Sequence, residues 1–210
     1  MKQHPGPHEA MIAAGLTPDE ALERLLAGNC RFVAAKLENP HRTAAYVRSI
    51  AHSQHPFAVL VGCADSRVAP EILFDQGLGD LFVNRVAGNC VSDDILGSIE
   101  YAVEHLGCSL VLVLGHERCG AIQAAIAAAT AGATFNGYVR HFIEAIRPAV
   151  EMCRAQAGDL DENALRANVL RNVEKIKTAS DIIHSKLLSG EVKVLGGRYD
   201  LDDGVVTLLG

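Results

Sequence analysis

Two short motifs carry side chains that can bind a metal and handle protons. The first, CADSR, places Cys63, Asp65 and Arg67 at alternate positions directly after an apolar run. The second, HERCG, places His116 and Cys119 three residues apart after another apolar run. Thiolates and imidazoles are common zinc ligands, and three protein ligands with one open position are typical of a catalytic zinc site. The alternative is that both cysteines are small buried residues and the histidine is a satisfied loop residue.

The acid and the base next to Cys63 have a use beside such a metal. Zinc lowers the pKa of a bound water from about 15.7 towards about 7, so hydroxide becomes available near neutral pH. An ionised Asp65 can accept a hydrogen bond from that water, and Arg67 can keep the acid ionised through a bidentate pair. Without the neighbouring cysteine, the two residues would be interpreted as an ion pair in a surface loop.

Three largely apolar runs predict the strands that position these motifs. They cover residues 57–62, 81–86 and 109–115, and short continuous runs of this kind are typical of strands buried on both faces. Helical patterns cover residues 92–107, 120–130, 138–155 and 161–188, and a pair of strands closes the chain. This alternation predicts an α/β fold with a mostly parallel central sheet and helices on both faces. Because ligands bind at the carboxyl ends of such strands, we expect both motifs at one edge of the sheet.

The sequence TPDEALERLLAGNCRFVAAK predicts an N-terminal helical arm over residues 17–36. Thr17 can cap this helix, Pro18 suits its first position, and Glu20 completes a capping box. Residues 1–16, which include two prolines, are expected to form a loose tail. We therefore predict one domain over residues 1–210, with the tail and the arm as its N-terminal appendages.

Composition narrows the range of partners and locations. The 210 residues carry a net charge of −6, so neither a nucleic acid nor an anionic membrane is an expected partner. No segment approaches the ~20 consecutive apolar residues of a membrane span, and the first residues make a poor signal peptide, so we expect a cytoplasmic protein. The six cysteines form no compact framework, which favours reduced thiols over disulfides. Cys30, Cys108 and Cys153 are expected to be small buried residues, whereas Cys90 could approach the metal motif.

The segments CADSR, NRVAGN, IEYAVEHLG and HERCG together resemble the β-class carbonic anhydrases, and the resemblance runs from about residue 17 to the end. It implies that Cys63, His116 and Cys119 bind zinc and that Asp65 and Arg67 form a dyad beside the metal. The implied reaction is the reversible hydration of carbon dioxide to bicarbonate and a proton, by attack of zinc-bound hydroxide. Because pockets in this family form between two subunits, the resemblance also implies a homodimer or a dimer of dimers.

Five further positions carry over from the family to the substrate pocket. Gln54 matches a glutamine that reaches a substrate oxygen across the dimer interface. Phe82 and Tyr101 match aromatic residues that line the apolar carbon dioxide pocket. Ala87 and Gly88 would leave only small side chains or bare backbone near the metal, as a three-atom substrate needs. The simpler alternatives are a loop role for Gln54 and a core role for the two aromatic residues.

One branch of the family has a closed state, in which the aspartate leaves its arginine and takes the fourth position on zinc. Bicarbonate bound to a tryptophan, an arginine and a tyrosine favours that state. The matching positions here are Leu60, Arg85 and Tyr199, and the chain contains no tryptophan. A ligand shifts an equilibrium only by its differential affinity, so a weaker bicarbonate site shifts it less. We therefore expect an open site in which Asp65 stays paired with Arg67.

Two alternative functions remain open at this point. The first is hydrolysis of carbonyl sulfide or carbon disulfide at the same zinc site, since both molecules are linear like carbon dioxide. The second is a non-catalytic zinc-binding or nucleotide-binding module. GHERCGAI has the glycine spacing of a phosphate loop, but Ala121 and Ile122 stand where that loop needs Lys and Ser or Thr. A non-catalytic zinc protein would be expected to lack Asp65 or Arg67, and both are present.

Overall fold

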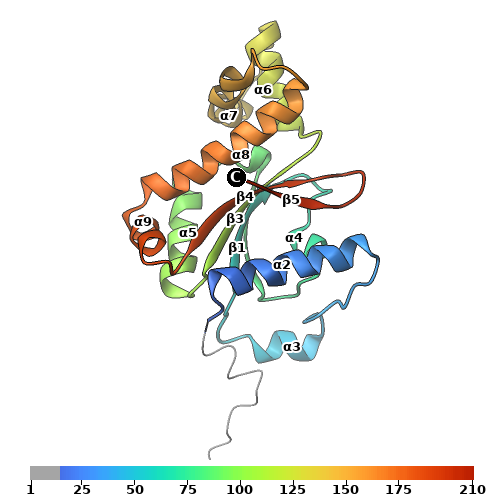
Figure 1. Cartoon of the computed structure of the whole chain (residues 1–210), viewed down its shortest axis with the longest axis vertical. Coiled ribbons are helices and arrows are strands. Elements are labelled where there is room, and N and C mark those ends of the chain that lie inside the picture. Colours follow the sequence, from blue (N-terminus) through green and yellow to red (C-terminus); the bar gives the residue numbers. More distant parts are fainter. Residues whose placement is uncertain (1–14) are drawn as a thin grey trace, which may run out of the picture.

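The computed structural model describes residues 15–210, and a five-stranded sheet forms its centre (Figure 1). The strands are β1 (Ala58–Cys63), β2 (Leu81–Val86), β3 (Leu110–His116), β4 (Lys193–Tyr199) and β5 (Val206–Leu209). They lie in the order β2-β1-β3-β4-β5, with the first four parallel and β5 antiparallel to β4. The predicted α/β fold with a mostly parallel sheet is therefore confirmed. The predicted tail lies outside the described residues, except for Gly15 and Leu16.

Helices connect the strands and cover both faces of the sheet (Figure 1). They are α2 (Pro18–Val33), α3 (Ala44–Ser49), α4 (Pro70–Leu73), α5 (Asp93–His105), α6 (Gly120–Ala131), α7 (Val139–Cys153), α8 (Leu160–Ala179) and α9 (Asp181–Leu188), and a 3-10 turn, η1, covers Ala87–Asn89. Every residue of β1 and β3 is buried. Burial from both sides explains why these two strands are continuous apolar runs instead of alternating patterns.

The two faces of the sheet have separate apolar cores. On one face, Leu25 of α2 and Phe74, which follows α4, belong to the same buried cluster as Leu60 and Leu112. On the other face, helices α5, α8 and α9 contribute buried apolar side chains around alternate residues of the same strands. A third cluster joins α6 and α7 to the end of β1 and to the loop that follows β3, and it includes Cys63 and Cys119. Apolar side chains thus cover part of the carboxyl edge of the sheet.

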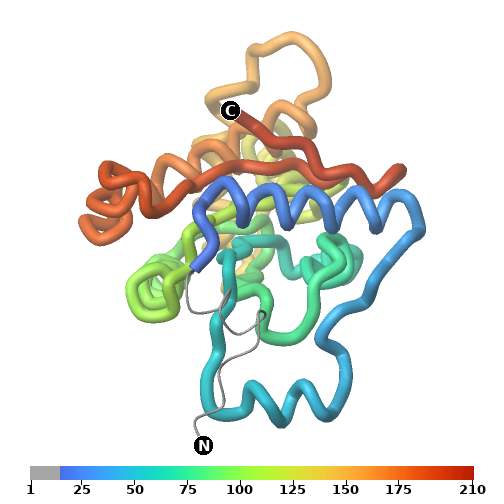
Figure 2. The backbone as a smooth tube through the Cα atoms, turned by 60° about the horizontal axis from the view of Figure 1, so that its bottom comes forward, coloured from blue at the N-terminus to red at the C-terminus, as the bar shows by residue number. Residues whose placement is uncertain are grey.

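The N-terminal helical arm packs on its own chain. Thr17 and Glu20 form the predicted capping box, and the helix ends at Val33, slightly before the expected residue 36. The buried Asn29 side chain donates to the carbonyl of Gly204 at 2.9 Å and accepts from the backbone N–H of Val206 at 2.9 Å. Figure 2 shows the result, with the blue α2 beside the red C-terminal strands. The arm is therefore part of the cover of the sheet.

The structure differs from the sequence-based expectations in a few elements. The short helices α3 and α4 were not predicted, because neither is long enough to show an apolar period. The single helix expected over residues 161–188 is two helices, since Ser180 ends α8 and its hydroxyl caps α9 by accepting from the N–H of Ile183 at 3.1 Å. Cys30 is exposed, contrary to the expectation that it is buried, whereas Cys108 and Cys153 are buried as expected.

Helix α8 approaches the sheet closely at two glycines. A Cβ atom at Gly115 of β3 would lie 2.6 Å from a methyl group of Val169, and one at Gly196 of β4 would lie 2.8 Å from its other methyl group. Val169 therefore occupies a slot formed by the two glycines on neighbouring strands. Within residues 15–210, no helix has both the length and the apolar composition needed to cross a membrane.

Candidate metal centre

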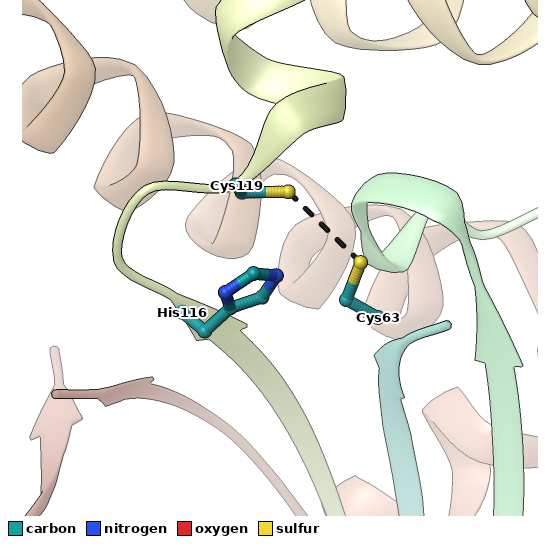
Figure 3. A group of neighbouring side chains, drawn as sticks. All are labelled: Cys63, His116 and Cys119. Carbon is teal, nitrogen blue, oxygen red and sulfur yellow. Dashed lines mark hydrogen bonds between the residues drawn. The ribbon is translucent and has the colours of Figure 1, made fainter. Parts of the chain in front are cut away.

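The ends of two neighbouring strands bring the three expected metal ligands together (Figure 3). Cys63 is the last residue of β1 and His116 is the last residue of β3, and these strands pair in parallel. Cys119 directly precedes α6, three residues beyond the end of β3. Because parallel strands end at the same edge of a sheet, residues 53 positions apart in the chain meet here, as the sequence predicts.

The geometry of the three side chains suits a metal ion. The Sγ atoms of Cys63 and Cys119 lie 3.9 Å apart, and each residue offers one ligand atom within 4.8 Å of the others. Two zinc–sulfur bonds of ~2.3 Å at a tetrahedral angle would separate the sulfur atoms by about 3.8 Å. All three residues are nearly inaccessible to solvent, with exposures of 4% for each cysteine and 1% for His116. The three ligand side chains are therefore compact enough to bind one ion and are themselves buried.

The His116 ring is oriented as a metal ligand. Its Nδ1 atom lies 2.8 Å from the carbonyl oxygen of Glu117 and donates to it, so Nε2 carries the free lone pair. Nε2 is buried and has no hydrogen-bond partner among residues 15–210. A buried nitrogen without a partner costs about 1–3 kcal/mol, and a metal ion would satisfy it. The residues present thus fit the metal that the motifs predict.

The two thiols share charge between them. The hydrogen bond from Cys119 is the main cause that lowers the pKa of Cys63 to about 4. The same hydrogen bond, together with burial, raises the pKa of Cys119. The pair therefore holds one negative charge and one proton. A metal ion that binds both sulfur atoms displaces that proton, which links metal binding to pH.

Asp65 and Arg67 form the expected dyad beside this group. Oδ1 of Asp65 accepts from the backbone N–H and from Nε of Arg67, both at 2.9 Å, and Oδ2 accepts from Nη2 at 2.8 Å. These hydrogen bonds are the main cause that lowers the pKa of Asp65 well below its ordinary range. Oδ2 lies 3.8 Å from Nε2 of His116. An ionised carboxylate thus stands next to the metal ligands and is held there by a guanidinium group.

Two arginines that the sequence did not assign to this loop hold it in place. Arg85 of β2 donates to the carbonyl oxygen of Cys63 at 2.9 Å and to that of Asp65 at 2.7 Å. Arg118 forms a two-point ion pair with Asp202, at 3.0 and 2.8 Å, and its carbonyl oxygen accepts from Arg67 at 3.3 Å. Arg118 lies inside the HERCG motif, whereas nothing local to Arg85 indicates its contacts with β1.

Of the five expected pocket residues, two lie at the metal ligands and three do not. Gly88 donates its backbone N–H to Sγ of Cys63 at 3.3 Å, and Ala87 packs against the cluster that contains both cysteines. Phe82 is near the start of β2, and its ring centre lies 6.3 Å from that of Tyr101 on α5. Gln54 precedes β1 and lines one pocket of about 600 Å³ with Tyr101. These three residues thus lie towards the amino ends of the strands, away from Cys63.

The residues aligned with the bicarbonate trio of the closed branch are not adjacent. Leu60 lies in the middle of β1 and is fully buried. Arg85 on β2 and Tyr199 on β4 are separated by β1 and β3.

Cys90 packs against the same cluster as the ligand cysteines, with its Sγ 3.6 Å from the carbonyl oxygen of Gly88, and burial raises its pKa to about 11.

Comparisons with known proteins agree with this geometry. A family model described as carbonic anhydrase matches residues 58–206. Carbonic anhydrase 2 of Mycobacterium tuberculosis is 41% identical over 191 residues, which cover 91% of this chain and 92% of that protein. The carbonic anhydrase of Mycolicibacterium smegmatis is 40% identical, with coverage of 91% and 93%. These names do not favour the sulfide-hydrolase or non-catalytic alternatives.

Solved structures of similar fold carry the same family name. The β-carbonic anhydrase of Coccomyxa, solved with acetazolamide, superposes with a TM-score of 0.68 at 30% identity, over 93% of this chain and 86% of that one. A structure from work on two tetrameric β-carbonic anhydrases of Sordaria macrospora superposes with a TM-score of 0.69 at 25% identity, over 90% and 96%. The chain therefore belongs to the β-class carbonic anhydrase family, whose general reaction is the hydration of carbon dioxide.

Proposed function

We propose that this protein hydrates carbon dioxide reversibly at a zinc ion held by Cys63, His116 and Cys119. The observation that carries the proposal is the buried Nε2 of His116, which has no partner in the described part of the chain and shares one small space with two sulfur atoms. Bound zinc supplies the reaction with a water acidic enough to act as a nucleophile near neutral pH. Two thiolate ligands give more negative charge to the metal than imidazoles would, so we expect the enzyme to favour alkaline conditions.

Asp65 orients the reacting water in this proposal. Its carboxylate can accept a hydrogen bond from a water molecule beside His116, because Oδ2 lies 3.8 Å from Nε2. Arg67 keeps that carboxylate ionised, since its guanidinium group binds both oxygen atoms. Asp65 therefore acts as a fixed acceptor that directs the lone pair of the water towards the substrate carbon.

We also infer that the site is open, with Asp65 on Arg67. For the carboxylate to move onto the metal, it would have to give up three hydrogen bonds to Arg67. The carbonyl groups of Cys63 and Asp65 are held by two of the five N–H donors of Arg85, which fixes the turn that carries Asp65. Arg85 also lies two strands away from Tyr199, so the two residues do not form a joint anchor for bicarbonate, which supports the open state.

The substrate pocket is completed by a second copy of the chain in this proposal. Gln54, Phe82 and Tyr101 lie too far along the strands to contact substrate at the metal group of their own chain. The resemblance places Gln54 across the dimer interface and Phe82 and Tyr101 in a pocket that forms between two subunits, and the similar Sordaria macrospora enzymes are described as tetrameric. We infer a homodimer or a dimer of dimers, working in the cytoplasm, where the thiols stay reduced.

The test is to measure zinc content and carbon dioxide hydration on the same purified protein. We expect about one zinc ion per chain and a hydration rate that rises towards alkaline pH in a stopped-flow assay. Cys63→Ser should lose both, whereas Cys153→Ser is a matched control, because Cys153 is equally buried but donates only to helix carbonyls such as that of Ala149 at 3.2 Å. Full activity in protein without metal would contradict the proposal.

A further inference from the structure

Helix α8 presents a row of three polar side chains to the segment that follows β2. Asn168, Asn172 and Lys175 are spaced by about one helical turn, and the two asparagines are buried, with exposures of 2% and 8%. Asn168 donates to the carbonyl oxygen of Gly88 at 2.9 Å. Buried amides on the apolar side of a helix are costly unless they are fully hydrogen-bonded, so such a row indicates a specific task.

The other two members of the row hold the end of the same segment. The Asn172 oxygen accepts from the backbone N–H of Val91 at 3.1 Å, and Lys175 donates to the carbonyl oxygen of Val91 at 2.7 Å. The Asn172 amide also donates to the backbone carbonyl of Asn168 at 2.9 Å, which joins the two asparagines. Three side chains of one helix thus fix the backbone from Gly88 to Val91 at both ends.

This segment has a backbone conformation that needs support. Gly88 and Asn89 both have left-handed dihedral angles, with φ of 68° and 45°. An asparagine in that region persists only where its surroundings hold it. This conformation directs the backbone N–H of Gly88 towards Sγ of Cys63, 3.3 Å away, so the segment contributes a hydrogen bond to the metal group.

We propose that Asn168, Asn172 and Lys175 are positioning residues for the metal centre, because they aim the Gly88 N–H at the Cys63 sulfur. The inference rests on the proposed zinc function. Hydrogen bonds to a ligating sulfur reduce the charge it gives to the metal, and groups that orient ligands typically change metal affinity by 10- to 100-fold. Helix α8 would therefore tune the metal through the backbone of Gly88.

The experiment uses cobalt in place of zinc, because the thiolate-to-cobalt charge-transfer band reports the electron density on the sulfur. We expect Asn168→Leu, a change of similar volume, to move this band to longer wavelength, since the sulfur loses its donor. Zinc affinity at pH 7, measured against a competing chelator, should fall about 10-fold. Lys175→Met, at an exposed position, should shift the band less but in the same direction. This second variant tests the proposal if Asn168→Leu does not fold.

Asn29→Leu is the matched control. Asn29 is also buried and also donates to backbone carbonyls, those of Leu73 and Gly204, but it lies between α2 and the C-terminal turn. We expect it to lower the melting temperature without moving the cobalt band. An unchanged band and affinity in both Asn168→Leu and Lys175→Met, or an equal shift in Asn29→Leu, would overturn the inference. A wild-type protein that binds neither ion would instead contradict the zinc function itself.

Discussion

The two ends of the parallel strands differ in how much a single chain completes. At the carboxyl ends, Cys63 and His116 are buried and the dyad next to them is fully hydrogen-bonded. At the amino ends, Tyr101 is 48% exposed and Gln54 lies on an open surface pocket. This difference fits the proposed division of labour, in which one chain builds the metal group and the proposed second copy supplies the substrate contacts.

A physical reason underlies this difference. Thiolates and an unpaired imidazole nitrogen are expensive to bury, so their surroundings must be fixed before a metal arrives. Hydrogen bonds fix these surroundings at the carboxyl edge. Arg85 binds the carbonyl oxygen of Cys63, Arg67 binds the carboxylate of Asp65, and the N–H of Gly88 binds Sγ of Cys63. An exposed glutamine or tyrosine is hydrogen-bonded to water, so leaving it without a protein partner costs little free energy.

The largest expected effect comes from removing a metal ligand at the carboxyl ends of the strands. His116→Ala leaves two ligands, so bound zinc should fall from about one ion per chain to a trace, and hydration should fall by more than about 100-fold, beyond the effect of losing a supporting residue. Metal analysis and stopped-flow hydration measure both quantities. The control is His184→Ala on the exposed side of α9, which should change neither. Retained zinc in His116→Ala would contradict the assignment of the metal group to the carboxyl ends of the strands.

Asp65→Ala should separate the reaction from metal binding. We expect about a 100-fold loss of hydration, in the range of a group that handles a proton, with zinc retained. Asp202→Ala is the matched control, because Asp202 forms a similar two-point pair with Arg118 but its side chain is largely exposed. Its activity should stay within about twofold of wild type. Loss of zinc from Asp65→Ala would make the aspartate a structural part of the centre.

The role of Gln54 at the amino ends of the strands is tested by combining two variant chains, one weakened and one inactive. Gln54→Ala removes one hydrogen bond to substrate, so we expect about a 10-fold loss of hydration. A hybrid dimer with His116→Ala contains one site that has both an intact metal group and an intact Gln54. Hybrids purified with two different tags should therefore exceed the average activity of the two parent variants. A hybrid that forms but shows no gain would mean that Gln54 does not act across an interface.

The smallest effect concerns the fold outside both ends. Asp75 is fully buried, and burial opposes its ionisation, but hydrogen bonds from Arg31 and from the N–H groups of Glu38 and Asn39 outweigh this and lower its pKa below the ordinary 3.8. Its stabilisation is fully present above pH 3.8 and is lost as the pH falls through the lower folded value.

Asp75→Asn should therefore lower the free energy of unfolding by about 1–3 kcal/mol at pH 7 and flatten its dependence on pH below about 4. Urea unfolding at several pH values measures both. Hydration activity at pH 8 should stay close to that of wild type, because the residue contacts neither end of the strands. An acid slope equal to that of wild type would show that other carboxylates dominate acid unfolding.

The sequence predicts the sheet and the metal group well for a common reason. Continuous apolar runs indicate strands buried on both faces, and the ends of such strands share one edge, so the meeting of Cys63 and His116 follows from topology. The amide row of α8 was not predicted, because Asn168 and Gly88 are 80 residues apart and nothing local links them. One signal was available, since two asparagines four residues apart interrupt the apolar side of that helix.

The glycine slot under Val169 limits how this family member can diverge. Even an alanine at Gly115 or Gly196 would place a methyl group within 3 Å of the valine, while a smaller residue at 169 would leave a cavity against two strands. Replacements at the three positions must therefore be coupled, because no single replacement keeps the packing. Asn168 directly precedes Val169 in α8, so the contact that fixes the valine against the sheet also fixes the start of the amide row.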